Sequence, residues 1–227
     1  MIKYESKKLF YDTYIYKLGV YNPVAFIFRN KNLSHARKVI DELQFNIDNK
    51  ENLQYKTCPT ALRHIDVHVD DIHDLKYLLT QFQEDNSEYM VRCEGRKMGI
   101  FSNDERWLTQ ISKKLNCVCD FYEPHENTID ILINNKNILI KNPPFSYEYK
   151  VTLGDKIIDS NFYNWAKVNA DKVRVSPGLL RTIYNKGYTK GKYLYLRDAK
   201  ILTLAHLFLS GNITRIDTIV LKDDVDK

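Results

Sequence analysis

Hydrophobic and polar positions change their period within a short stretch in the first half of the chain. Ile65, Val67 and Val69 alternate with polar residues, which is typical of a strand with one buried face. Directly afterwards, apolar residues between Ile72 and Phe82 recur at helical spacing behind two aspartates. The pattern therefore predicts a strand at 65–69 that leads into a helix at 72–82.

The same pattern continues in a recognisable order. A hairpin with strands at 89–94 and 98–102 turns at Gly95. A helix at 105–115 begins after Ser102, which forms a capping box with Glu105, and a closing strand follows at 117–122. The order strand, helix, two strands, helix, strand is that of a ferredoxin-like unit. We assign this unit, with a further hairpin at 129–133 and 138–140, to residues 61–142.

The proline pair Pro143-Pro144 marks the expected boundary to a second unit, residues 145–227. Strands at 147–153, 172–175, 193–196 and 213–221 alternate with helices at 162–168 and 201–209. Ser176-Pro177 and Gly187 delimit one additional short helix. The second unit thus repeats the order of the first, with one insertion.

The first 60 residues form an N-terminal extension that we expect to pack on the first unit. Two Tyr-rich and Phe-rich stretches, 9–18 and 24–28, predict a β-hairpin, and Ser34 is placed to cap a helix behind it. The fold class predicted is α+β: two tandem ferredoxin-like units with antiparallel sheets, preceded by a hairpin and a helix.

A weak internal repeat supports the duplication. The segment that starts at Asp104 matches the segment that starts at Asp198, and the same offset aligns Leu115 with Leu209 and Phe101 with Tyr195. Each copy reads as a basic turn, a strand, an aspartate and a helix.

Composition narrows the function classes. The chain has 227 residues, of which 44% are hydrophobic and 28% charged, so a disordered or fibrous protein is excluded. Four cysteines without a charged-then-apolar leader favour the cytoplasm, and no apolar run reaches the roughly 20 residues of a membrane-spanning helix. No motif is a specific catalytic signature, so whether the protein is an enzyme stays open.

Positive charge is concentrated in two segments. Residues 1–38 and residues 171–200 each hold eight Lys or Arg against two Asp or Glu, although the net charge of the chain is only +5. A polyanion is expected to meet these segments, unless their lysines serve only to solubilise the surface.

The clearest candidate for such contacts is the segment from Lys190 to Arg197. If Leu194 faces the core, Tyr193 and Tyr195 point outward beside a basic turn. The segment resembles the third strand of RNA-recognition domains, where alternating aromatics stack on bases, although Leu194 stands where those domains carry glycine or alanine. The leading hypothesis is non-enzymatic binding of single-stranded RNA or DNA, without a cofactor, by Lys172, Arg174, Arg181, Lys186, Lys190, Lys192, Tyr193, Tyr195 and Arg197.

An alternative lies on the first predicted strand. His64, Asp66 and His68 would share its open face with Glu94 of the neighbouring strand, which suggests an endonuclease that uses a histidine or a divalent metal. His64 and His68 are about 13 Å apart on a straight strand, too far for one metal to bind both. Endoribonucleases that process CRISPR transcripts are similar in joining two ferredoxin-like domains, but their glycine-rich C-terminal loop is missing here.

A whole-chain resemblance is carried by Phe26 to Val39 and Val173 to Ile183, which look like segments of uncharacterised accessory proteins of tailed bacteriophages. The resemblance implies a viral protein in the cytoplasm of a bacterial host and says nothing of activity. A third hypothesis is therefore a structural phage component whose N-terminal hairpin binds a protein partner.

Overall fold

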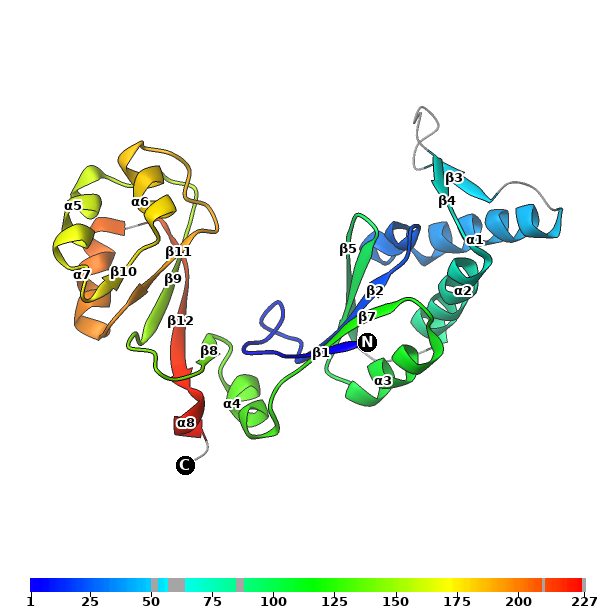
Figure 1. Ribbon diagram of the computed structural model, residues 1–227, viewed down its shortest axis with the longest axis horizontal. Coiled ribbons are helices and arrows are strands. Elements are labelled where there is room, and N and C mark those ends of the chain that lie inside the picture. Colours follow the sequence, from blue (N-terminus) through cyan, green and yellow to red (C-terminus); the bar gives the residue numbers. More distant parts are fainter. Residues whose placement is uncertain (50–52, 57–63, 85–87, 210, 226–227) are drawn as a thin grey trace. The chain divides into compact units, whose positions relative to one another are not determined.

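The computed structural model describes residues 1–49, 53–56, 64–84, 88–209 and 211–225. The chain is a mixed α+β protein that divides into two compact units, Met1–His125 and Glu126–Lys227. Each unit contains one five-stranded mixed sheet, and helices cover one side of each sheet (Figure 1). In the part of the chain that the structure describes, no helix is long and apolar enough to cross a membrane.

The sheet of the first unit has the strand order β1-β7-β2-β6-β5. Its strands are β1 (Ile2–Glu5), β2 (Tyr16–Tyr21), β5 (Tyr89–Glu94), β6 (Lys97–Ser102) and β7 (Val118–Glu123). Neighbouring strands are antiparallel except for β1, which pairs in parallel with β7.

Helices α1 (Leu33–Asp48), α2 (Val69–Glu84) and α3 (Glu105–Lys114) supply the buried apolar side chains that cover this sheet. Leu18 and Ile100 of the central strands and Leu75 of α2 are fully buried. A separate two-stranded sheet joins β3 (Gln54–Lys56) to β4 (His64–Asp66).

The sheet of the second unit has the order β8-β12-β9-β11-β10 when it is read from its parallel edge strand, which matches the first sheet position for position. Its strands are β8 (Ile138–Lys141), β9 (Tyr149–Leu153), β10 (Val173–Arg174), β11 (Tyr193–Leu196) and β12 (Ile213–Leu221). Again all pairs are antiparallel except the edge strand β8, which runs parallel to β12.

Three helices build the core of this unit together with the sheet: α5 (Ser160–Val168), α6 (Pro177–Tyr184) and α7 (Ala199–Leu209). Ser176 caps α6 by accepting a hydrogen bond from the N–H of Leu179, and Pro177 occupies the first helical position. Shorter helices come first and last in the sequence of the unit: η2 (Glu126–Thr128) and α4 (Ile129–Asn134) at its start, and α8 (Lys222–Val225) at its end.

The predicted strand at 65–69 is shorter than expected. Strand β4 ends at Asp66 and, among the described residues, pairs only with β3; α2 already begins at Val69, whose side chain is exposed. The backbone N–H of His68 donates to the Asp71 carboxylate at 2.9 Å, which fixes the helix start there. The first strand of the ferredoxin-like order that was predicted at 65–69 is therefore replaced in the five-stranded sheet by β2.

Both predicted hairpins outside the two strand-helix repeats are wrong. Of the predicted strand 24–28, residues 25–28 lie in the 3-10 helix η1 (Ala25–Lys31), because the buried Asn22 side chain accepts from the N–H of Val24 and turns the chain. Residues 129–133 lie in α4, and the strand after them, β8, pairs with distant β12 rather than with its neighbour. Short apolar runs do not distinguish a strand from a buried helical turn.

Two further differences concern the sheets and the division of the chain. The sheets are mixed rather than purely antiparallel, since each carries a parallel edge strand. The units divide between His125 and Glu126, before the proline pair, because η2, α4 and β8 belong to the second unit.

Candidate nucleic-acid interface

Strand β11 has the predicted alternation. Leu194 and Leu196 are fully buried against the helices, whereas Tyr193 is 47% exposed and Tyr195 is half-buried on the opposite face. The hydrophobic residues hold the strand in register, so both tyrosine rings project from the face that carries no helix.

The two tyrosines belong to a row of four aromatic rings. The ring centroid of Tyr195 lies 5.5 Å from Tyr193, 5.1 Å from Phe145 and 6.2 Å from Tyr147. These are the distances of edge-to-face and tilted aromatic pairs. Phe145 and Tyr147 come from the segment before β9 and were not among the predicted residues, because continuing the alternation of β9 would place them on the core face with Val151 and Leu153.

Cations lie over this aromatic row. Lys150 Nζ is 4.4 Å from the ring centroid of Tyr193, and Lys141 Nζ is 5.7 Å from that of Tyr195. Arg174 of β10 is the register partner of Tyr195 on β11. Lys150 and Lys141 also lie outside the predicted set, because cross-strand register rather than sequence proximity brings them to the tyrosines.

A pocket of about 680 Å³ opens beside the row where β10 ends. Strand β10 pairs with β11 over only two residues, and the chain then turns into α6, which leaves Tyr193 without a strand partner on that side. The pocket is lined by Arg174, Val175, Ser176, Pro177, Gly178, Leu179, Gly191, Lys192, Tyr193 and Tyr195. Four predicted residues meet there: Arg174, Lys192, Tyr193 and Tyr195.

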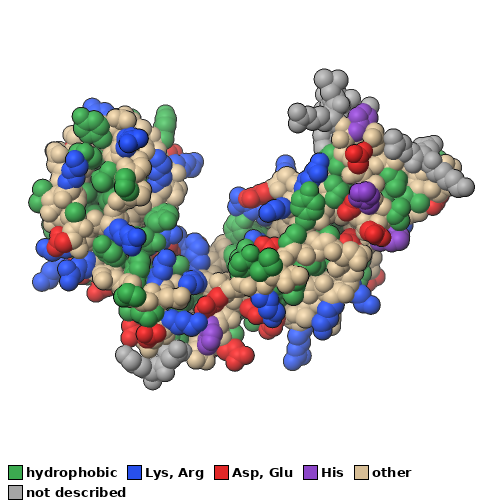
Figure 2. All heavy atoms as spheres, in the orientation of Figure 1, with side chains coloured by type: hydrophobic (Ala, Val, Ile, Leu, Met, Phe, Trp, Pro, Cys, Tyr) green, Lys and Arg blue, Asp and Glu red, His purple; other side chains and the backbone are tan. Residues whose placement is uncertain are grey.

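The other five predicted residues do not line this pocket. They are exposed or half-buried on the same unit, and Arg197 contributes to a different hollow, of about 610 Å³, near Glu148 and Asp198. Figure 2 shows Lys and Arg side chains distributed among hydrophobic ones on the visible face of this unit. The five are Lys172, Arg181, Lys186, Lys190 and Arg197.

The phenol of Tyr195 stays neutral near neutral pH. Burial raises its pKa above the ordinary value, the nearby Tyr193 phenol adds to the increase, and the Arg174 guanidinium lowers it. A neutral hydroxyl can donate to an anion without repelling it, and it leaves the positive charge of Arg174 uncompensated by a phenolate.

Buried polar side chains fix the loop that leads into β11. Thr189 and Asn212 are 0% and 4% exposed; the Thr189 hydroxyl donates to the Gly154 carbonyl at 3.0 Å, and Asn212 Nδ2 donates to Thr189 Oγ1 at 3.2 Å. Asn212 also bonds both backbone groups of Lys156. Three loops at this end of the unit are thereby tied together immediately before Gly191 and Lys192.

The alternative set in the first unit does not share one sheet face as predicted, because β4 pairs with β3 in a separate sheet and Glu94 lies on β5 of the five-stranded sheet. His64 and Asp66 lie exposed on β4, where Asp66 accepts from Gln54 Nε2 at 2.9 Å, and His68 stands at the start of α2. Glu94 of β5 is paired with Arg92 at 2.6 Å. Among the described residues no group of three or more His, Cys, Asp or Glu side chains is arranged to hold a metal ion.

Comparison of the chain with protein-family models, with curated proteins and with solved structures finds no match. The interpretation of the site therefore depends on its own residues.

Proposed function

We propose that the protein binds single-stranded nucleic acid through the aromatic row and the adjoining pocket of the second unit. The observation that carries the proposal is Tyr193: its ring is 47% exposed, next to Lys150 on one side and to the pocket with Arg174 and Lys192 on the other. Every base offers a π-face to an exposed ring, and every nucleotide offers a phosphate to a nearby cation.

A single strand suits the arrangement better than a duplex. The bases of a duplex are stacked on one another, whereas unpaired bases are free to stack on protein aromatics. The row provides flat rings, and its cations lie over the rings rather than along one projecting helix. Such sites bind with little sequence preference and strong salt dependence.

The assignment of both units to the ferredoxin-like fold is part of the same proposal. In both units four strands follow the spatial order fourth, first, third, second: β7-β2-β6-β5 and β12-β9-β11-β10. This is the order of the ferredoxin-like fold, and each unit adds one parallel strand beside the fourth. We infer that the two units are copies of one ferredoxin-like ancestor with that added strand.

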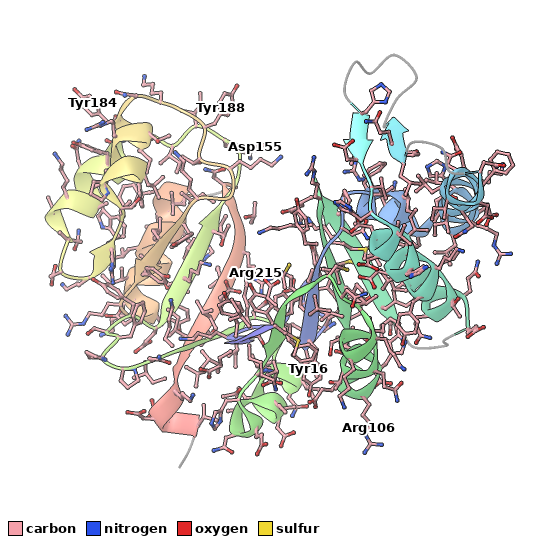
Figure 3. The ribbon with its side chains drawn as sticks, turned by 45° about the vertical axis from the view of Figure 1, so that its right-hand side comes forward. Tyr16, Arg106, Asp155, Tyr184, Tyr188 and Arg215 are labelled. Carbon is pink, nitrogen blue, oxygen red and sulfur yellow. The ribbon has the colours of Figure 1, made fainter. Side chains whose placement is uncertain are left out.

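Fluorescence anisotropy with a short labelled oligonucleotide tests the function. Tyr193→Ala is expected to weaken binding by roughly five- to a hundredfold, since stacking of a base on an aromatic ring contributes about 1–3 kcal/mol. The matched control is Tyr188→Ala, because Tyr188 is even more exposed, 79%, and does not line the pocket (Figure 3). Equal effects of both substitutions, or binding that is absent or unaffected by salt, would reject the proposal.

A further inference from the structure

The pocket differs from the open aromatic row in being walled on two sides. Residues 175–179 border it from the β10 to α6 connection, and residues 191–193 border it from the start of β11. The rings of Phe145, Tyr195 and Tyr193 lead up to it in that order. Its volume of about 680 Å³ lies in the range that suits a small organic ligand.

Two of the residues that line the pocket are glycines without a side chain. Gly178 and Gly191 are exposed, and a Cβ placed on either would meet no heavy atom within 4 Å beyond its chain neighbours. Gly191 has a φ of +73°, which favours glycine on backbone grounds as well. Backbone on both sides is therefore open to close approach by a ligand.

Two cations line the same pocket. Lys192 Nζ donates one hydrogen bond to Thr182 Oγ1 at 2.6 Å, which positions an ammonium that has three donors in all. Arg174 lines the pocket next to Tyr195, its register partner on the neighbouring strand. Arg174 lines the pocket from the open face of the sheet and Lys192 from the helix side, and cations on two sides of one pocket match an anion of more than one charge.

We propose that this pocket receives the terminal nucleotide of a single strand together with its terminal phosphate. This inference rests on the proposed function. It goes further by naming the end of the strand as the part that the pocket binds. An internal phosphodiester carries one negative charge, whereas a terminal phosphate monoester carries about 1.5 to 2 near pH 7. The strand lies along the aromatic row, and its last base stacks on Tyr193, beside the wall that residues 175–179 form.

Linear and circular DNA of one sequence distinguish an end from an internal segment. The probes are internally labelled oligothymidylates: a closed ring, a linear strand with hydroxyls at both ends, and linear strands with a 5′- or a 3′-phosphate. A strand phosphorylated at the recognised end is expected to bind the full-length protein roughly tenfold more tightly than the ring. Thymidine monophosphate serves as a competitor that carries the same chemistry without a strand.

Substitutions assign the preference to the pocket. Arg174→Ala and Lys192→Ala are expected to reduce binding of the phosphorylated strand to the level of the ring. The matched control Arg181→Ala removes an exposed cation of α6 that does not line the pocket, and it should leave the ratio unchanged. Circular dichroism verifies that each variant folds.

Five outcomes have different meanings. A preference that depends on Arg174 and Lys192 supports the inference. Equal binding of ring and phosphorylated strand, or a preference that survives both substitutions, overturns it while the proposed function stands. Thymidine monophosphate that binds as tightly as the phosphorylated strand also overturns it, because the pocket would then select a free nucleotide. Failure of every DNA to bind rejects the proposed function itself.

Discussion

Asp104 and Asp198 make the same contact at the start of helices in different units. Asp104 Oδ1 accepts a hydrogen bond from the N–H of Trp107 at 2.9 Å, and Asp198 Oδ1 accepts one from the N–H of Ile201 at 3.0 Å. Each carboxylate satisfies an N–H that the first helical turn leaves unpaired, and its charge is favourable at that end of the helix. The repeated aspartate in the sequence therefore has the same structural role twice.

Removing either cap is expected to destabilise the unit that contains it. Asp104→Ala and Asp198→Ala should each lower the free energy of unfolding by about 1 kcal/mol. The variants Asp104→Asn and Asp198→Asn should keep most of this stability, because asparagine also caps helices. The two tryptophans lie in different units, so urea unfolding followed by fluorescence in Trp165→Phe or Trp107→Phe backgrounds reports on one unit at a time. Asp155→Ala, at an exposed loop position, is the control. Losses no larger than that of the control would contradict the prediction.

Lys150 is expected to contribute to the salt dependence of binding. Lys150→Ala removes the cation over Tyr193, so the slope of log affinity against log salt should fall by about one unit. Lys167→Ala is a matched control, because Lys167 Nζ lies 4.5 Å from the ring centroid of Tyr163 on helix α5 of the same unit. Anisotropy titrations at several salt concentrations measure both slopes. If the two variants lose affinity equally, Lys150 has no special place in the interface.

Alkaline pH is expected to destabilise the protein. Burial raises the pKa values of Tyr16, Tyr77, Tyr89 and Tyr195 above the ordinary value of 10.0. The folded state therefore favours the neutral phenols; this stability is fully present below about pH 10 and is lost as the pH rises through the higher folded pKa values. Urea unfolding midpoints should be constant around pH 8 and fall above pH 10. Titration of all sixteen tyrosines of the native protein at the ordinary pKa would contradict this.

The cysteines are expected to differ sharply in reactivity. Cys119 is exposed, whereas Cys93 is buried with its pKa raised to about 11, and its thiol donates to the Ala25 carbonyl. Burial and the Asp74 carboxylate raise the pKa of Cys117 as well. In a Cys58→Ser background, a thiol reagent should label Cys119 first and the other two only on unfolding. Mass spectrometry identifies the order, and early labelling of Cys93 would refute it.

Part of this structure could be predicted from the sequence because its signals are local. Strands β11 and β12 have the predicted bounds, and α6 begins where Ser176 and Pro177 place it. In each case the residues that define the element also bury it or cap it. Alternation on β11 likewise predicted which face Tyr193 and Tyr195 share.

The remainder depends on contacts between distant segments. Edge strand β1 was not predicted, and β8 was predicted as a strand but with the wrong partner; no local pattern reveals that they pair with β7 and β12. The candidate site shows the same limit: Lys150 reaches Tyr193 through the register of β9 with β11. A search confined to one basic segment therefore finds half of the interface.

The hydrogen bonds of Thr189 and Asn212 have a thermodynamic consequence for any ligand. They immobilise the loop ahead of Gly191 and Lys192 during folding, so that a bound strand does not have to order it. The conformational entropy of that loop is already spent when the ligand arrives, and more of the contact energy remains as affinity.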